Sequence, residues 1–174
     1  FPFLGTVGGR IADHTNQCRI TLGGNLCGTV IYRETVLPLL LSEAQVALWG
    51  PGGRREAPLS EAFQGRMRLE EGEFVHQVRV DAAFTRMPYA HIKQTVGEKI
   101  GYPAVTVSAL FEADRMRVAF SGICHEPFRS QTMEEALSDR SLTPQDRVRR
   151  AAGLLPMEPL TDPEGSGEYR MCIL

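Results

Sequence analysis

Two pairs of adjacent glycines, Gly8-Gly9 and Gly23-Gly24, are the first features of this sequence that could do chemistry. Adjacent glycines let backbone amides approach a phosphate or a sugar without a Cβ in the way. The same pairs are also typical of tight turns that need positive φ angles, and the residues alone leave both interpretations open. Neither pair matches GxGxxG or the P-loop spacing, so the sequence indicates neither a Rossmann nucleotide site nor a P-loop.

Cysteine and histidine, the usual protein ligands of zinc, are scattered singly along the chain. No CxxC, HxxxH or HExxH spacing occurs among them, so we expect no zinc site. The cysteine spacing is also not that of a disulfide framework. We therefore expect free thiols in a cytoplasmic protein, buried as small hydrophobic side chains: Cys18, Cys27, Cys124 and Cys172.

The composition excludes several classes of protein. Of the 174 residues, 43% are apolar and 23% charged, which indicates neither a disordered nor a fibrous chain. A net charge of -2 argues against non-specific nucleic-acid binding, which needs an excess of basic residues. No apolar run reaches the roughly 18 residues of a membrane span. The chain begins with Phe1 and not with an initiator Met, and we expect it to be a piece of a longer protein.

The first part of the chain is expected to form helices and loops followed by a hairpin. Residues 1–13 are typical of the end of a helix that enters a loop, and residues 14–32 of an extended loop. Apolar residues at helical spacing predict a short helix within residues 33–44. Strands are expected over residues 44–49, 54–58 and 73–80.

The second part is expected to place strands before helices, which is typical of the α+β class and not of alternating βαβ units. The crossing between the two parts is expected around residues 81–90. Thr132 and Thr143 are candidate helix caps, and a proline follows Thr143 at the first helical position. Strands are expected over residues 104–112 and 116–123, and helices over residues 131–138, 144–152 and 166–174.

The second glycine pair lies in the stretch Thr21-Leu22-Gly23-Gly24-Asn25, and Glu34 follows nine positions after Asn25. This stretch resembles one in the FAD-binding subunit of molybdenum hydroxylases, the family of xanthine dehydrogenase and of the carbon monoxide dehydrogenase medium subunit. In that family a Thr-Ile/Val-Gly-Gly-Asn loop lies against FAD, and an acidic residue nine positions after the Asn binds hydroxyls of the cofactor. The acidic residue here is Glu34, where many members have Asp. The matching loop of this chain consists of Thr21, Leu22, Gly23, Gly24 and Asn25.

Three further residues match positions that lie near flavin in the family. Ile11 falls where some relatives carry an aromatic side chain on the ring face. The strand over residues 73–80 is similar to one whose backbone passes the isoalloxazine ring, which implicates Val75. Lys93 matches a lysine that brings positive charge to the reducible ring. Two plainer interpretations stay open: Glu34 as a carboxylate at a helix N-terminus, and Lys93 as a solvated surface lysine.

The resemblance implies an α+β chain of two parts. Residues 1–82 would be the second half of a PCMH-type FAD-binding subdomain. Residues 83–174 would resemble the C-terminal domain of the carbon monoxide dehydrogenase flavoprotein, with a three-stranded antiparallel sheet and a helical bundle. Residues 102–107 match the strand that opens this domain, and residues 165–170 the start of its last helix. The first pyrophosphate loop of the family, in an N-terminal FAD subdomain, has no counterpart in this sequence.

The resemblance also implies a function. The complete subunit would take electrons from 2Fe-2S clusters on an iron–sulfur subunit, fed by a molybdenum-cofactor subunit, and pass them through FAD to NAD⁺ or another acceptor. The chain would be the FAD-binding part of an oxidoreductase, inactive alone. No ligand pattern for molybdenum or iron–sulfur clusters occurs in the sequence, so these groups are expected on partner subunits. The alternative is a non-catalytic assembly module that docks a partner without flavin.

Overall fold

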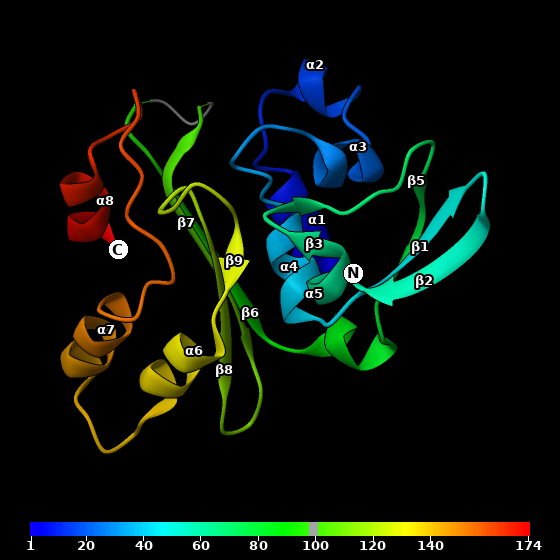
Figure 1. The fold of residues 1–174 in the computed structure, drawn as a ribbon. Helices are drawn as coiled ribbons and strands as arrows, with labels where there is room; N and C mark the ends of the chain where they lie inside the picture. The colour runs from blue at the N-terminus through cyan, green and yellow to red at the C-terminus, as the bar shows by residue number, and fades with distance from the viewer. Residues whose placement is uncertain (98–100) are drawn as a thin grey trace.

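A computed structural model describes residues 1–97 and 101–174 of the chain. The two main β-sheets lie side by side, and the chain passes from the first to the second through the 3-10 helix η1 (Ala82–Arg86) (Figure 1). The first half of the chain lies on one side of the larger sheet, and the last three helices lie on the other (Figure 1). This arrangement of helices and antiparallel strands confirms the α+β class expected from the sequence.

The first half begins with short helices and continues into a small antiparallel sheet with the strand order β2-β1-β5. A β-bulge between Ala47 and Leu48 shifts the register of β1 against β5. The helices are α1 (Pro2–Gly8), α2 (His14–Gln17), α3 (Leu22–Cys27), α4 (Val36–Leu41) and α5 (Leu59–Ala62). The strands of this sheet are β1 (Gln45–Gly50), β2 (Gly53–Pro58) and β5 (Phe74–Arg79). Between β2 and β5 in the sequence, β3 (Phe63–Gln64) and β4 (Arg66–Met67) form a short separate pair.

The second half builds the larger sheet, whose described strands are ordered β6-β7-β8-β9. Alternation along β8 sends Val118 and Phe120 to the core that contains Met133 of α6, while Ala119 packs with Leu37 and Leu41 of α4. The sheet is therefore covered on both faces. Its strands are β6 (Tyr89–Thr95), β7 (Pro103–Phe111), β8 (Met116–Ser121) and β9 (Phe128–Arg129), and its helices are α6 (Gln131–Ser138), α7 (Pro144–Ala152) and α8 (Gly167–Ile173).

The three-stranded sheet expected from the sequence is corrected to four strands among the described residues, and no strand was predicted where β6 lies. In β6 the polar side chains His91 and Lys93 point toward the first half of the chain, where Arg10 and Glu34 lie. Ile92, on the opposite face, is 64% exposed. Because its polar face is turned inward, β6 does not have the usual pattern of a half-buried strand.

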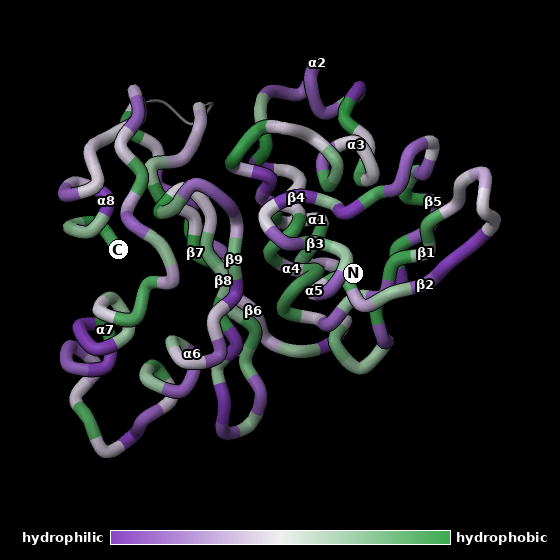
Figure 2. The backbone as a smooth tube through the Cα atoms, viewed as in Figure 1, coloured by the Kyte–Doolittle hydropathy of each residue, from purple (hydrophilic) through white to green (hydrophobic). Residues whose placement is uncertain are grey.

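Helix α4 is buried on all sides and joins the two halves. Val36 and Leu39 pack into the core of the first sheet, whereas Leu37 and Leu41 pack with Leu110 beneath the second. Pro38 lies in the first turn of the helix, where a missing N–H is tolerated. Figure 2 shows the apolar character of α4 and, by contrast, the hydrophilic outer strand β2.

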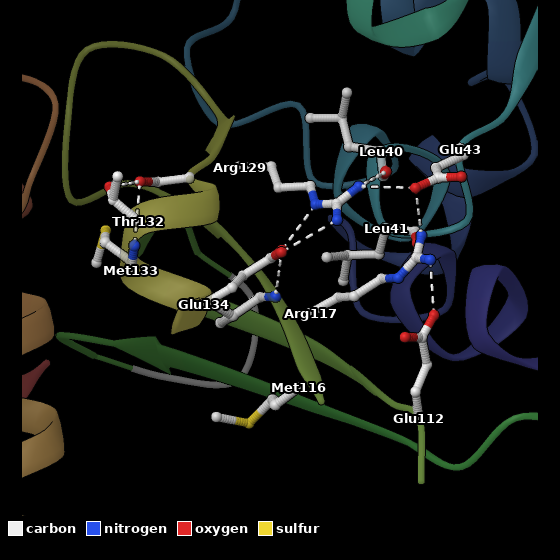
Figure 3. A network of polar contacts seen from close by, with 12 residues as sticks. Leu40, Leu41, Glu43, Glu112, Met116, Arg117, Arg129, Thr132, Met133 and Glu134 are labelled. Carbon is white, nitrogen blue, oxygen red and sulfur yellow. Dashed lines mark hydrogen bonds and ion pairs between the residues drawn. The ribbon is translucent and has the colours of Figure 1, made fainter. Parts of the chain in front are cut away.

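Two arginines of the larger sheet hold the end of α4 (Figure 3). The guanidinium of Arg117 donates to the carbonyl of Leu41 (3.0 Å), and that of Arg129 donates to the carbonyl of Leu40 (3.2 Å). Both arginines also pair with Glu43, at 2.7 and 3.6 Å. These contacts satisfy helix carbonyls that have no partner within the helix. We refer to Arg117, Arg129 and Glu43 as the arginine junction.

Several local predictions are corrected. Residues 14–32 contain α2 and α3, and are not one extended loop. Ser130, and not Thr132, caps α6 by accepting the amide N–H of Met133, whereas Thr143 caps α7 as predicted. The four cysteines are free thiols, but Cys124 is the buried one, and Cys18, Cys27 and Cys172 are exposed. Among the described helices, none has the length and apolar character that crossing a membrane requires.

Candidate functional site

A cavity of about 400 Å³ opens between the loops around α2 and α3, the start of the larger sheet, and the segment before α4. Its apolar lining includes Ile11, Ile20, Val30, Tyr32 and Tyr102, and its polar lining includes Asn16, Asn25, Arg33, Glu34 and Lys93. A mixed lining of this kind, with few polar groups among apolar and aromatic side chains, is typical of sites for small molecules and cofactors.

The polar centre of the cavity wall is a buried ion pair. Lys93 Nζ lies 2.9 Å from Glu34 Oε2, and the two side chains are 3% and 4% exposed. The hydroxyl of Thr106, opposite Lys93 in the β6–β7 register, donates to the other carboxylate oxygen at 3.0 Å. Lys93 Nζ also donates to the backbone carbonyl of Arg10 at 2.9 Å. The pair thus ties the segment before α4 and the end of α1 to the larger sheet.

Burial dominates the electrostatics of this group. Desolvation raises the pKa of Glu34 above its usual value, although Lys93 and Thr106 act in the opposite direction. Desolvation lowers the pKa of the neighbouring His91 to about 4, and the positive charges of Arg10 and Lys93 add to this effect. His91 is therefore neutral at pH 7, with Nδ1 hydrogen-bonded to the Ser108 hydroxyl at 2.9 Å.

The structure brings Ile11, Asn25, Glu34 and Lys93 together around this cavity, although they come from distant parts of the sequence. The interpretation of Lys93 as a solvated surface lysine is wrong, because it is 8% exposed. Glu34 directs both carboxylate oxygens at β6 and β7, so the contacts do not support its interpretation as a helix-terminal carboxylate.

The Thr-Leu-Gly-Gly-Asn stretch is not a loop but the start of helix α3. Thr21 is the N-cap, and its side chain accepts the amide N–H of Gly24 at 3.0 Å. Leu22 packs against the first core. Gly23 lies against Val75 of β5, where an added Cβ would come within 3.6 Å of the Val75 carbonyl. Thr21, Leu22, Gly23 and Gly24 lie outside the cavity lining, as does Val75 of β5. Asn25 belongs to the lining.

The positive-φ interpretation of the glycine pairs is also corrected. Gly8 ends α1 and Gly9 is its C-cap with φ -67°. Gly23 and Gly24 are within α3, and neither has a positive φ. At position 24 an added Cβ would lie 2.9 Å from Thr21 Oγ1, so glycine there leaves room for the hydroxyl that caps the helix, whereas at position 23 it would make only an ordinary contact with Val75.

Sequence reasoning missed the aromatic part of the cavity. Tyr32 and Tyr102 stack with ring centroids 4.9 Å apart and an angle of 23° between the rings. Tyr32 is buried and Tyr102 is 53% exposed. Tyr102 lies in a stretch that matched the family, but its ring could not be assigned to the site because Tyr32 is distant in the sequence. Arg33 is also buried in the wall, and its guanidinium lies 5.0 Å from the ring of Phe63.

The lining can be compared with the needs of a flavin. A flavin ring is planar and aromatic, with polar atoms along its edge, and requires apolar faces together with a few hydrogen-bonding groups. Tyr102 and Ile11 offer apolar faces, and Asn25 and Lys93 offer polar ones. The residues present fit a flavin.

No metal site competes with this interpretation within the described ranges. There, no group of three or more His, Cys, Asp and Glu side chains is arranged to hold a metal ion.

Comparison with known proteins first identifies the class. A family model described as the FAD binding domain in molybdopterin dehydrogenase matches residues 1–82. The recognition made from the sequence is confirmed: the chain is related to the FAD-binding subunits of the molybdenum hydroxylase family.

Among individual relatives, the chain is 26% identical over 177 residues to the carbon monoxide dehydrogenase medium chain of Hydrogenophaga pseudoflava. The match covers 97% of this chain and 61% of the relative, so the chain spans less than two thirds of the length of that protein.

Solved structures show the same fold. A carbon monoxide dehydrogenase from Hydrogenophaga pseudoflava that lacks the Mo-pyranopterin moiety of its cofactor superposes with a TM-score of 0.84 at 24% identity, covering 99% of this chain and 63% of that one. Quinoline 2-oxidoreductase from Pseudomonas putida 86 superposes with a TM-score of 0.77 at 21% identity, covering 98% and 62%.

Proposed function

We propose that the chain binds FAD in the cavity between α3 and the larger sheet, as part of the FAD-binding subunit of a molybdenum hydroxylase. The observation that carries this proposal is the meeting of Ile11, Asn25, Glu34 and Lys93 in one lining. Each was assigned to FAD by its own match to the family, and only the fold brings them together. Residues 1–82 and 83–174 are proposed as the two domains, which the span of the family match supports.

The roles of these residues follow from their contacts. Ile11 packs against a ring face, and the Asn25 amide can donate to or accept from polar edge atoms. Glu34 uses one oxygen for Lys93 and one for Thr106, and a carboxylate has lone pairs left for a sugar hydroxyl. Lys93 is held in place by Glu34, so it offers the cofactor a fixed dipole and not an isolated positive charge. Leu22, Gly23 and Val75 act indirectly by supporting α3.

When bound, FAD would pass electrons between the partner subunits and a final acceptor. The proposed partners are an iron–sulfur subunit with 2Fe-2S clusters and a molybdenum-cofactor subunit, which the similarity to a carbon monoxide dehydrogenase medium chain supports. In its more specific form, we propose a xanthine dehydrogenase-like reaction in the cytoplasm, with NAD⁺ as the electron acceptor. Reduction of NAD⁺ by the assembled complex is the measurement that checks the acceptor.

We propose that the cavity, of about 400 Å³, holds only part of FAD and that a preceding segment with a further pyrophosphate loop completes the site. The match covers 61% of the carbon monoxide dehydrogenase medium chain, and the rest of that protein leaves room for such a segment. We therefore expect weak binding of FAD by the 174-residue chain alone and tight binding after co-expression with that segment.

The test is equilibrium dialysis of FAD against the chain and two Ile→Trp variants. Ile11→Trp places a larger side chain in the cavity from a partly exposed position and keeps both residues of the buried ion pair, and it should weaken binding about tenfold or more. Ile92→Trp is the matched control, because Ile92 is exposed on the opposite face of β6. Equal binding by all three proteins would contradict the proposal. No retention of FAD, even with the preceding segment present, would favour the alternative of a docking module without flavin.

A further inference from the structure

The match of residues 165–170 to the family is not explained by FAD contacts, and the structure gives it a different role. Arg170 of α8 is fully buried. Its guanidinium donates to the carbonyls of Pro103 (3.4 Å), Gly122 (2.6 Å) and Ala104, which lie at the start of β7 and just after β8. A short helix is thus fixed to one end of the larger sheet by one side chain.

Gly122 shows how tightly this end of the sheet is packed. It has a φ of +82°, and an added Cβ would lie 2.9 Å from the carbonyl of Ala104 and 3.0 Å from that of Pro103. Backbone and guanidinium therefore converge on the same carbonyls, and the position of Arg170 is determined by the sheet.

Asp162 connects Arg170 to the cavity. One carboxylate oxygen accepts from the Arg170 guanidinium and from the amide N–H of Glu164 (2.8 Å). The other oxygen accepts from the hydroxyl of Tyr32. Burial and Asp162 both raise the pKa of Tyr32, so this hydroxyl stays protonated and donates at all ordinary pH values. The carboxylate is therefore held between a fixed cation and a cavity residue.

Tyr32 and Tyr102 together form the aromatic wall of the cavity. The hydroxyl of Tyr32 is bound by Asp162, its backbone carbonyl accepts from the buried hydroxyl of Ser121 at 2.9 Å, and its ring stacks on Tyr102. Tyr102 directly precedes Pro103, whose carbonyl Arg170 binds. Asp162 therefore contacts the side-chain hydroxyl of Tyr32, and Arg170 holds the residue that follows Tyr102 through the Pro103 carbonyl.

We infer that Asp162 and Arg170 are positioning residues that fix the Tyr32–Tyr102 wall and so set the affinity of the cavity for a planar aromatic ring. The inference rests on the proposed function in that the ring would be the flavin of FAD. Neither residue touches the cavity, since neither belongs to its lining. Their effect is transmitted through the hydroxyl of Tyr32 and the backbone at Pro103.

The test compares Tyr32→Phe, Asp162→Ala and Asp162→Asn with the control Tyr169→Phe, which removes a phenol hydroxyl from α8 at a residue outside the cavity. Tyr32→Phe keeps the buried ring and is expected to fold. In the FAD-free chain, NMR contacts between the ring of residue 32 and that of Tyr102 report the wall itself. Equilibrium dialysis with FAD then reports the consequence for binding.

The expected result is weaker ring contacts and about threefold to tenfold weaker FAD binding in Tyr32→Phe and Asp162→Ala, the size of the effect of one ordinary hydrogen bond. Asp162→Asn keeps an oxygen that can accept from Tyr32 and should recover part of both losses. The control should match the wild type. Unchanged ring contacts in Tyr32→Phe and Asp162→Ala would overturn the inference whatever happens to FAD. Altered contacts in a chain that does not bind FAD would support the positioning role and overturn the proposed function.

Discussion

Two groups of charged side chains join the first half of the chain to the larger sheet, and they differ mainly in their contact with water. The Glu34–Lys93 pair beside the cavity is 4% and 3% exposed. In the arginine junction, Arg117 is 14% exposed and its partner Glu43 is 59% exposed. The first group is desolvated on both sides, whereas the second has one partner in solvent.

This difference in burial implies different functions. A carboxylate or an ammonium that loses its partner inside the protein remains as an uncompensated charge, so neither Glu34 nor Lys93 can be changed alone without a large loss of stability. The arginine junction mainly satisfies the last carbonyls of α4, and water can replace part of it. We therefore assign the arginine junction to the fold and the Glu34–Lys93 pair to both the fold and the site.

The largest effect is expected from Glu34→Ala. The variant leaves the Lys93 ammonium buried with the Arg10 carbonyl, and the free energy of unfolding should fall by about 3–5 kcal/mol. Urea unfolding measures this loss. A loss below about 1 kcal/mol would place the pair among ordinary surface pairs and remove the difference between the two groups.

The double variant Glu34→Leu with Lys93→Met separates stability from binding. It removes both charges, so most of the lost stability should return, since replacing a whole buried pair by apolar residues is often neutral. FAD binding should stay weak, because the polar wall of the cavity is gone. Recovery of both stability and FAD affinity would show that the pair has no role in the site.

An intermediate effect is expected from Arg117→Ala in the arginine junction. The variant removes a donor from the Leu41 carbonyl and a partner from Glu43 and Glu112, which both remain in contact with water, at a loss of about 1–3 kcal/mol. The affinity for FAD, measured by equilibrium dialysis at a temperature where the variant is folded, should be unchanged. A parallel loss of affinity would mean that the two groups act as one.

An effect of comparable size is expected from pH. Burial lowers the pKa of His91 to about 4 in the folded chain, against about 6.5 for a histidine exposed to water. Between these values the unfolded chain binds more protons than the folded one, so the free energy of unfolding falls as the pH is lowered through this window. The comparison of wild type with His91→Gln by urea unfolding at several pH values isolates this slope. Replacement of the exposed His14 is the control, and an equal slope in His91→Gln would contradict the assignment.

The smallest effect is expected from Arg54→Ala. Arg54 and Glu56 form a pair on β2 in which the side chains are 42% and 41% exposed. Such pairs contribute less than about 1 kcal/mol, because water and salt screen them. Thermal unfolding of this variant gives the smallest loss of stability, against which the losses in the Glu34–Lys93 pair and in the arginine junction are compared.

Local patterns predicted local structure well. The strand β5 and the hairpin of β1 and β2 follow from alternation and turn residues, and Thr143-Pro144 marks the start of α7. The patterns failed where the environment of a residue comes from another part of the chain. The inward polar face of β6 is one example, and the partner of Lys93, 59 residues away, is another.

The candidate site shows the same limit. The resemblance selected Asn25, Glu34 and Lys93 residue by residue, and the fold brought them to one cavity. Tyr32 was missed because its partners, Tyr102 and Asp162, are distant in the sequence. The glycine pair was predicted as part of a loop, but it lies in helix α3, where Gly24 leaves room for the Thr21 cap; a tight turn would favour glycine in the same way.

The most direct test of the account is a titration of the isotopically labelled chain with FAD, followed by the NMR signals of its backbone amides. This measurement suits the weak binding expected of the chain alone. The account predicts that the signals of Ile11, Asn25, Tyr32, Glu34 and Lys93 move together with one dissociation constant, while those of Trp49 and Val148 stay in place. Shifts centred away from the cavity, or none at all, would contradict the assignment of this cavity to FAD.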